Sequence, residues 1–480
     1  MMQPLPRDFS SIDRKARIKI ESRGLPFRPV AQRIRDFDEV IAPLDEDWAV
    51  HEASRCIHCP DPPPCQRACP VGNDISYAMW LIENRRFLEA AQVYRQTSNL
   101  PAICGRVCPH EQFCQMACPL GKRGAPVLTG ALEAFVADYE RNTHPAEIFP
   151  GTPSGKQVAV VGAGPAGLSA AEELVKYGHC VTIFDAKPAP GGLLVYGIPN
   201  FKLPKSIVWS KWETLAKAGV QFVGDTYIGR DKTIDDLFDE GFEAVFLGVG
   251  TSIDARMGKT PGTDLTGVYQ ATDFLERGNV NPDALPSDKR EPLKIGSRVV
   301  VVGGGDTASD CLRTALRLGA KNVTCLYRRS EKEMPGCEKD RQLAQEEGAK
   351  YRFLVQPVRF IPGADGQLIA VECVQTRLGE PDGSGRRRPI PVEGSNFSIP
   401  ADTAILALGY WPDPIIGETT PDLETHKWGL IKVIDPESGA TTRPGIFAGG
   451  DCVTGPDVVA TAMVSGRKAA AAIDEYLSGS

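Results

Sequence analysis

The sequence predicts an α/β fold in which a helical, cysteine-rich N-terminal domain precedes two domains built on parallel sheets. Three observations carry this prediction. Of 14 cysteines, 8 lie between Cys56 and Cys118. A unit of strand, glycine-rich turn, helix and strand begins near residue 157, and a second such unit begins near residue 298. The length of 480 residues is enough for three domains of ordinary size.

Composition and charge exclude several classes of protein. The formal net charge of −7 argues against nucleic acid as the main partner. The sequence contains no run of about 18 apolar residues, so it predicts no membrane span. The first residues, MMQPLPRDFSSIDRKARIKI, lack the apolar core of a secretory signal. We therefore expect a cytoplasmic location, where cysteines are more often metal ligands or redox groups than disulfides.

The first 145 residues are expected to be mainly helical. The stretch 74–96, DISYAMWLIENRRFLEAAQVYRQ, predicts one helix that is capped by Asn73 or Asp74. The stretch 130–142, GALEAFVADYERN, predicts a second helix. A linker rich in proline and glycine, 144–156, then leads into the first strand.

The first glycine turn follows the apolar strand Val158–Val161. Its first glycine permits the tight turn, the second lets the backbone approach a pyrophosphate, and the third lets the helix pack closely on the strand. The helix N-terminus offers N–H donors to phosphates. A carboxylate at the end of the next strand can bind ribose hydroxyls. These features predict a Rossmann-like domain with the binding residues Gly162, Gly164, Pro165, Ala166, Gly167 and Asp185.

The stretch GIFAGGDCV, 445–453, resembles the second FAD motif of flavoprotein reductases with two dinucleotide-binding domains. The resemblance implies that Asp451 holds the ribitol chain and that a helix from about Val459 points its N-terminus at the flavin. The stretch 186–205, AKPAPGGLLVYGIPNFKLPK, resembles the loop beneath the isoalloxazine in that group. FAD is therefore expected at the first domain, with further contacts from Gly192, Leu193, Lys202, Gly450 and Asp451.

The second glycine turn points to NADPH. Alanine replaces its third glycine, which the motif tolerates. Where NAD-binding domains usually place an acid, the chain has Arg328 and Arg329, which would bind a 2′-phosphate. The alternative is that one arginine caps a loop or pairs with Glu331 or Glu333. The strand ILALGY, 405–410, resembles the one that closes over the nicotinamide. The predicted NADPH residues are Gly303, Gly304, Gly305, Asp306, Thr307, Arg328, Arg329 and Gly409.

These motifs set the expected domain limits. Residues 1–145 form the helical domain, 155–253 and 404–480 form two halves of an FAD domain, and 254–403 form an inserted NADPH domain. No side chain is predicted to be catalytic, because hydride transfer between the two cofactors needs orientation more than an acid or base. The flavin loop has no CxxC pair, which argues against a disulfide-reductase mechanism.

The cysteines form two similar sets, Cys56-x2-Cys59-x5-Cys65-x3-Cys69 and Cys104-x3-Cys108-x5-Cys114-x3-Cys118. Structural zinc sites usually consist of two CxxC pairs separated by a longer span. The spacing seen here, with proline directly after four of the cysteines, is more typical of iron–sulfur ligation. Eight cysteines could hold two 4Fe–4S clusters, with the last cysteine of a set ligating the other cluster.

The whole chain resembles the small (beta) subunits of bacterial NADPH-dependent glutamate synthases. The stretches RIRDFDEV, ASRCIHCPDPPPCQRACPVGNDI and GRVCPHEQFCQMACPLG carry the resemblance. The same module occurs in dihydropyrimidine dehydrogenase, in the large subunit of NADH-dependent ferredoxin:NADP oxidoreductase and in sulfide dehydrogenase. The resemblance implies that Cys56, Cys59, Cys65 and Cys118 hold one cluster, and that Cys69, Cys108 and Cys114 hold the other. The fourth ligand of this second cluster is either Glu133 or Cys104.

The resemblance implies an electron path from NADPH through FAD and two 4Fe–4S clusters to the FMN of a large (alpha) subunit. That partner would make L-glutamate from L-glutamine and 2-oxoglutarate, and the two subunits would form a hetero-oligomer. The chain begins Met-Met-Gln and offers no N-terminal cysteine nucleophile, so glutamine chemistry is assigned to the partner. Two rivals remain. One keeps the same electron path with another partner, as a subunit of a ferredoxin:NADP oxidoreductase or as a sulfide dehydrogenase. The other is from a different class, an FAD-dependent reductase with a structural zinc domain used only for docking.

Overall fold

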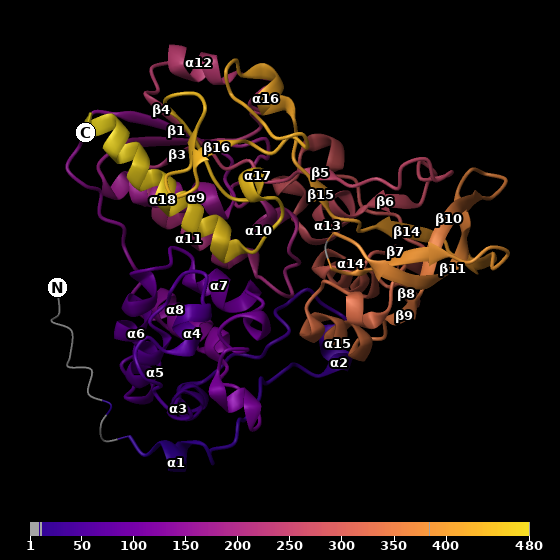
Figure 1. Ribbon diagram of the computed structural model, residues 1–480, viewed down its shortest axis with the longest axis horizontal. Helices are drawn as coiled ribbons and strands as arrows, with labels where there is room; N and C mark the ends of the chain where they lie inside the picture. The colour runs from indigo at the N-terminus through magenta and orange to yellow at the C-terminus, as the bar shows by residue number, and fades with distance from the viewer. Residues whose placement is uncertain (1–8, 10–11, 384, 480) are drawn as a thin grey trace.

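The computed structural model describes residues 9, 12–383 and 385–479. The first eight residues, on which part of the signal-peptide prediction rests, lie outside the described residues. Figure 1 shows a helical N-terminal domain below a sheet domain that contains the C-terminus, with a second sheet domain beside them. The predicted α/β fold with a helical N-terminal domain is confirmed. No helix among the described residues is long and apolar enough to cross a membrane.

Short helices joined by loops build the N-terminal domain. Its apolar core contains Met79, Leu81, Phe87 and Leu132, which are each buried. The helices are α1 (Arg14–Arg17), α2 (Val30–Arg33), α3 (Glu46–Ser54), α4 (Pro64–Ala68), α5 (Ile75–Glu83), α6 (Phe87–Arg95), α7 (Pro101–Val107) and α8 (Thr129–Thr143), with 3₁₀ turns at His110–Gln112 and Pro119–Lys122.

The single helix predicted over 74–96 is wrong, because the chain forms α5 and α6 there. Arg85 adopts φ +56°, a left-handed conformation that interrupts helical hydrogen bonding. Asp74 caps α5 as predicted, since its side chain accepts a hydrogen bond from the N–H of Tyr77 at 3.3 Å. The helix predicted over 130–142 is confirmed as α8.

A seven-stranded sheet unites segments that lie far apart in the sequence. Its order is β16-β17-β18-β4-β1-β2-β3, and β1 pairs in parallel with both β2 and β4. The strands are β1 (Gln157–Val161), β2 (Cys180–Phe184), β3 (Gln221–Val223), β4 (Ala244–Leu247), β16 (Val433–Asp435), β17 (Ala440–Thr441) and β18 (Ile446–Ala448). Its helices are α9 (Pro165–Lys176), α10 (Leu193–Tyr196), α11 (Lys205–Lys217), α12 (Ile234–Asp239), α16 (Ile415–Thr419), α17 (Asp451–Thr454) and α18 (Val459–Ser478).

A five-stranded parallel sheet in the order β6-β14-β7-β8-β9 forms the second sheet domain. Its strands are β6 (Val268–Gln270), β7 (Arg298–Val302), β8 (Asn322–Tyr327), β9 (Lys350–Phe353) and β14 (Thr403–Leu406). An antiparallel sheet adjoins it, formed by β10 (Val355–Pro362), β11 (Leu368–Pro381), β12 (Arg387–Pro391) and β13 (Phe397–Pro400). Its helices are α13 (Ala271–Asn279), α14 (Asp306–Arg317) and α15 (Glu338–Glu346), with 3₁₀ turns at Pro282–Ala284, Ser287–Lys289 and Glu331–Glu333.

The predicted limit between 403 and 404 falls inside β14 and is wrong. β14 pairs in parallel with β6 and β7, so it completes the second sheet before the chain returns to the first. The crossing points are β5 (Ile253–Asp254) and β15 (Tyr410–Trp411), which pair with each other in an antiparallel ribbon. The other predicted domain limits stay predictions.

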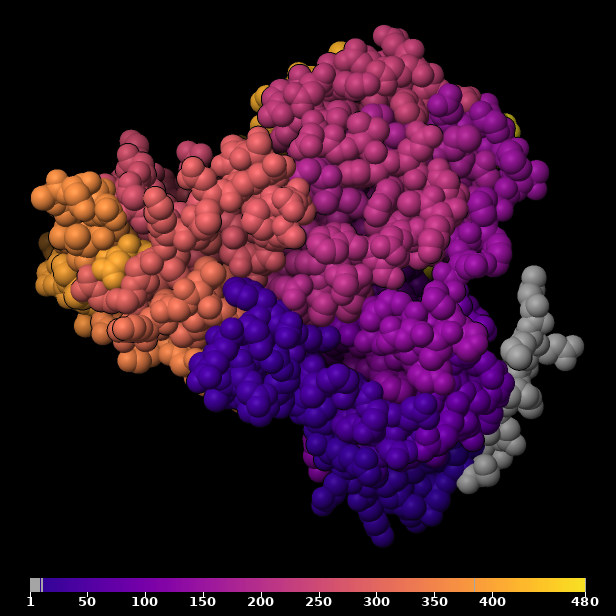
Figure 2. Space-filling model, turned by 180° about the vertical axis from the view of Figure 1, so that it is seen from behind, coloured from indigo at the N-terminus to yellow at the C-terminus, as the bar shows by residue number. Residues whose placement is uncertain are grey.

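The helical domain contacts both sheet domains. Ile103 and Cys104 of α7 belong to the same apolar core as Val158 and Leu168 of the first sheet domain. A segment around α2 reaches the second sheet domain, where Arg33 forms ion pairs with Glu346 and Glu347. In Figure 2 the N-terminal surface accordingly adjoins that domain. The contact at α7 places Cys104 and Cys108 beside the first sheet domain.

Candidate dinucleotide and iron–sulfur sites

The first glycine turn has the geometry that a bound pyrophosphate requires. Gly162 adopts φ +101°, and a Cβ atom there would lie 2.4 Å from the carbonyl oxygen of Gly248. A Cβ atom at Gly167 would lie 1.8 Å from the carbonyl oxygen of Gly162, so α9 packs closely on β1. The space beside Gly164 is open, and no side chain caps α9. The first N–H groups of the helix are therefore available to phosphate oxygens.

Two further predicted FAD elements converge on this turn. A Cβ atom at Gly192 would lie 2.8 Å from the Cα of Gly164. A Cβ atom at Gly450, which adopts φ +76°, would lie 3.2 Å from the Cβ of Ala166. The flavin-type loop and the C-terminal motif therefore meet the glycine turn from two sides. The described residues fit a long ligand such as FAD.

The two predicted FAD carboxylates follow β2 and β18. The carboxylate of Asp185 accepts hydrogen bonds from the N–H groups of Ala163 at 2.6 Å and Lys187 at 2.8 Å. Burial raises the pKa of Asp185, although these two hydrogen bonds oppose the rise. Asp451 begins α17, and burial raises its pKa to about 7. Asp185 is thus held against the glycine turn itself, next to where a ribose would follow the pyrophosphate.

The second glycine turn repeats the design in the other sheet domain. A Cβ atom at Gly303 would lie 2.1 Å from the carbonyl oxygen of Ala407, which lies within the predicted nicotinamide segment. Gly305 borders open space at the uncapped N-terminus of α14. The carboxylate of Asp306 accepts a hydrogen bond from the N–H of Cys337 at 2.8 Å. Open space also adjoins Gly409, so the described residues fit a second dinucleotide.

The two arginines at the end of β8 have different surroundings. Arg329 is buried, donates to the carbonyl of Arg387 at 2.7 Å and forms an ion pair with Asp382 at 2.6 Å. Arg328 is exposed, and its side chain forms no hydrogen bond or ion pair among the described residues. The predicted pair is therefore split: Arg328 is available to a phosphate, whereas Arg329 holds the β11–β12 hairpin. The alternative that one arginine holds a loop therefore applies to Arg329. Its other form, a pairing with Glu331 or Glu333, is wrong, because Glu331 pairs with Arg341 and Glu333 binds Ser330.

A cavity of about 910 Å³ lies where the three domains meet. Leu193 of the predicted flavin loop, Thr307 of α14 and Val459 at the start of α18 line it. Cys108 and His110 of the helical domain line the same cavity. Its volume is in the usual range for small-molecule sites. The cavity therefore joins flavin, nucleotide and cysteine elements that the sequence predicted separately.

Lys202 lines this cavity but is engaged with the second sheet domain. Its ammonium lies 3.3 Å from a carboxylate oxygen of Asp310 and 2.6 Å from one of Asp340. Burial alone would lower the pKa of Lys202, but the carboxylates of Asp310 and Asp340 raise it. Lys202 thus ties the flavin-type loop to α14 and α15, a role that the sequence did not predict. Its contact with FAD stays a prediction.

The structure brings together the four thiols predicted for the first cluster. Burial raises the pKa of Cys56 to about 12 and that of Cys65 to about 12. In both cases the charges of Cys118 and Cys59 add to the rise, so Cys118 lies with the earlier cysteines despite its distance in the sequence. All 14 cysteines are free thiols. A cluster of half-buried thiols that would repel one another as thiolates fits a cationic iron–sulfur core.

The residues proposed for the second cluster line one small cavity. Burial raises the pKa of Cys69, and the negative charge of Glu133 raises it further. Burial also raises the pKa of Cys114, and the charges of Cys69 and Glu133 raise it further. A hydrogen bond with Cys104 raises the pKa of Cys108. The wall of this cavity includes Cys69, Cys104, Cys108, Cys114 and Glu133.

Two polar residues that the sequence did not predict also face this small cavity. Tyr94 is 1% exposed, and its Oη has no hydrogen-bond partner among the described residues. The Nε2 of His110 is also buried without a partner among them, and His110 lines the large cavity as well. Buried polar atoms are rarely left unpaired in native proteins. These unpaired atoms are evidence for a polar occupant between the thiols.

Comparison with known proteins agrees with this division. A family model for the 4Fe–4S cluster domain II of dihydropyrimidine dehydrogenase matches residues 33–145, and one for pyridine nucleotide-disulphide oxidoreductases matches residues 156–466. The glutamate synthase (NADPH) small chain of Escherichia coli (strain K12) is 40% identical over 460 residues, which is 94% of this chain and 96% of that protein. The chain belongs to the family of glutamate synthase (NADPH) small chains. Membership confirms the predicted class, an NADPH-dependent flavin oxidoreductase with a 4Fe–4S domain.

Other similarities are consistent with the family. AegA of Escherichia coli (strain K12), named as an oxidoreductase with no stated substrate, is 42% identical over 469 residues, covering 95% of this chain and 70% of that protein. The structure of Mycobacterium tuberculosis FprA in complex with NADPH is 21% identical, with a TM-score of 0.55 over 68% of this chain and 85% of that one. This structural similarity supports the fold of the two sheet domains.

Proposed function

We propose that the chain is the NADPH-oxidising electron-input subunit of a glutamate synthase. Electrons would pass from NADPH through FAD and two 4Fe–4S clusters to the FMN of a large subunit, for reductive synthesis of L-glutamate from L-glutamine and 2-oxoglutarate. The large cavity carries the proposal. It places the N-terminus of α14, the flavin-type loop and Cys108 around one space, so no diffusing carrier is needed between them.

In this proposal the chain's residues bind and orient the cofactors. The N–H groups at the starts of α9 and α14 would hold the two pyrophosphates. Leu193 and the N-terminus of α18 would flank the flavin, because both line the large cavity. The exposed Arg328 would bind the 2′-phosphate that distinguishes NADPH from NADH.

We assign Glu133 as the fourth ligand of the second cluster, beside Cys69, Cys108 and Cys114. Glu133 is 6% exposed, and its only hydrogen-bond donor among the described residues is Asn73 at 3.4 Å. A buried carboxylate without a cation is costly, and coordination to iron would remove that cost. Cys104 needs no such partner, because a buried thiol packs as a small apolar residue.

The partner would be the FMN-bearing large subunit of glutamate synthase. The small chains in this family are named for one part of a larger enzyme, and the two family models that match this chain describe a 4Fe–4S domain and an oxidoreductase domain. The resulting hetero-oligomer would take electrons from the helical domain, because that domain contains all the proposed cluster ligands.

Anaerobic purification with and without the candidate large subunit tests the proposal. We expect about eight iron and eight acid-labile sulfide per chain. The complex should oxidise NADPH only when glutamine and 2-oxoglutarate are both present. Iron without that activity would reject glutamate synthase but keep the electron path. Zinc in place of iron would reject the electron path as well.

AegA supports a second candidate function, since this oxidoreductase is about as similar to the chain as the glutamate synthase protein is. In that case the same path would end at another acceptor, as in a ferredoxin:NADP oxidoreductase or a sulfide dehydrogenase. NADPH oxidation that requires added ferredoxin or polysulfide, and is indifferent to glutamine, would favour it.

A further inference from the structure

The phenol of Tyr94 lies beside the second thiol set with its polar atom unpaired. Tyr94 is on α6 and belongs to the apolar core of the helical domain, together with Phe87 and Leu132. It is almost fully buried, and its Oη has no hydrogen-bond partner among the described residues. The small cavity that it lines also contains Cys69, Cys114 and Glu133.

Packing does not explain the hydroxyl of Tyr94. A phenylalanine would make the same apolar contacts, and a buried hydroxyl without a partner costs free energy. The ligating groups of the cavity wall are acceptors, since the thiols become thiolates on iron and Glu133 is a carboxylate. Asn73 and Thr129 also line the wall, but Asn73 already donates to Glu133 and Thr129 is hydrogen-bonded to Cys114. An unpaired hydroxyl donor in this wall is therefore matched to an acceptor that occupies the cavity.

We propose that Tyr94 donates its O–H to a sulfur of the second 4Fe–4S cluster. This inference rests on the proposed function, which assigns that cluster to Cys69, Cys108, Cys114 and Glu133. Hydrogen bonds to cluster and thiolate sulfurs raise the reduction potential, because they stabilise the more negative reduced state. Tyr94 is thus a residue that sets the potential without ligating iron.

The position of the second cluster gives this hydrogen bond a purpose. Cys108 and His110 line both the small cavity and the large one, so the second cluster borders the predicted flavin. It is therefore the first acceptor of electrons that leave the flavin. A raised potential at this cluster favours that step.

Tyr94→Phe tests the inference, because it removes a single oxygen atom. Tyr139→Phe is the matched control: Tyr139 is on α8, packs on Phe87 and Phe135, and is absent from the wall of the small cavity. The measurements are made on the cluster-loaded chain. They are the midpoint potential of each cluster, from titration followed by electron paramagnetic resonance, and the coupling of exchangeable deuterons after transfer to D₂O. The second cluster is identified as the one whose signal Cys114→Ser changes.

We expect Tyr94→Phe to lower the midpoint potential of the second cluster and to remove one coupled deuteron, and Tyr139→Phe to do neither. Two clusters with an unchanged potential and coupling in Tyr94→Phe would overturn this inference alone. An unaltered chain whose second cluster couples to no exchangeable deuteron would overturn it without any variant. An unaltered chain with no second cluster would instead contradict the proposed function.

Discussion

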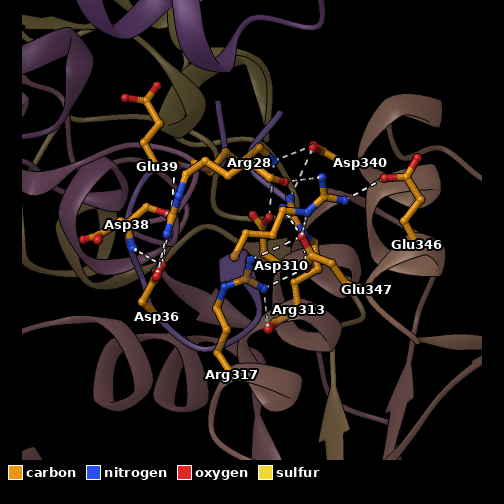
Figure 3. Close-up of polar contacts among 12 residues, drawn as sticks. Arg28, Asp36, Asp38, Glu39, Asp310, Arg313, Arg317, Asp340, Glu346 and Glu347 are labelled. Carbon is orange, nitrogen blue, oxygen red and sulfur yellow. Dashed lines mark hydrogen bonds and ion pairs between the residues drawn. The ribbon is translucent and has the colours of Figure 1, made fainter. Parts of the chain in front are cut away.

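Two glutamates, Glu133 and Glu347, are both buried but have opposite surroundings. The carboxylate of Glu347 accepts hydrogen bonds from Arg33 at 3.0 Å, Arg313 at 2.9 Å and Arg317 at 2.7 Å. Figure 3 shows Arg313 and Arg317 pointing at it from the neighbouring helix. Among the described residues, Glu133 has only the amide of Asn73 as a hydrogen-bond donor, at 3.4 Å.

The surroundings move the two pKa values in opposite directions. Burial raises the pKa of Glu133 to about 8, and the hydrogen bond from Asn73 opposes this only weakly. Burial would raise the pKa of Glu347 too, but hydrogen bonds and charge from Arg313 and Arg317 hold it below its usual value. The carboxylate of Glu347 therefore has its cationic partners within the chain, and it helps to join the helical domain to the second sheet domain. The other lacks a cation, which is what a proposed iron ligand requires.

Of the variants that test this comparison, replacement of Glu133 should have the largest effect. We expect Glu133→Leu to lose the second cluster and so to lower the iron content from about eight to about four per chain. The first cluster should remain, because its four thiols are separate. Iron and acid-labile sulfide analysis of the anaerobically purified chain measures this. Full iron content in Glu133→Leu would show that the carboxylate is not a ligand.

Glu347→Gln should leave iron unchanged and reduce stability instead. It keeps the shape of the side chain but leaves the buried guanidinium of Arg317 without an ion-pair partner among the described residues. Breaking a buried ion pair in this way typically costs about 3–5 kcal/mol. Denaturant unfolding of the cluster-loaded chain measures the loss. Glu346→Gln is the matched control, because Glu346 pairs with the same Arg33 but its side chain is 56% exposed. Its expected cost is below about 1 kcal/mol, and an equal cost for both variants would contradict the account of the joint.

The pH dependence of the Glu347→Gln deficit sharpens the comparison further. Since the folded-state pKa of Glu347 lies below its unfolded value, its contribution to stability is present above the unfolded pKa and is lost as pH falls through the folded pKa. The stability gap between the original chain and Glu347→Gln should therefore be widest near neutral pH and narrow below about pH 4.5, near the usual pKa of glutamate. A gap that stays constant between pH 7 and pH 4 would count against a charged Glu347.

The features that the sequence predicted are local. Each glycine turn lies within a few residues of its strand and helix, so motif spacing predicted both turns. The start of α18 was implied by the resemblance of the stretch 445–453 to a known FAD motif. The thiol sets were predicted for the same reason. The break between α5 and α6 was missed, because the left-handed conformation of Arg85 leaves no strong signal in a helix-forming stretch.

The features that the sequence missed depend on contacts between distant segments. Arg33 and Glu347 are 314 residues apart, and Lys202 meets Asp310 across a domain boundary. Arg328 and Arg329 look equivalent in the sequence, but the ion pair of Arg329 with Asp382 leaves only Arg328 available to a phosphate. Burial of Glu133 and Tyr94 follows from how α6 and α8 pack, which no local pattern in either helix specifies.

The most direct test of the central claim is the iron content of Cys104→Ser. Cys104 lies in the same cavity wall as Glu133 and is its competitor as the fourth ligand. If Glu133 ligates the second cluster, Cys104→Ser should retain about eight iron per chain and the spectra of both clusters. If Cys104→Ser lost about half the iron while Glu133→Leu kept all of it, Cys104 would be the fourth ligand. That result would contradict the assignment of Glu133 as an iron ligand.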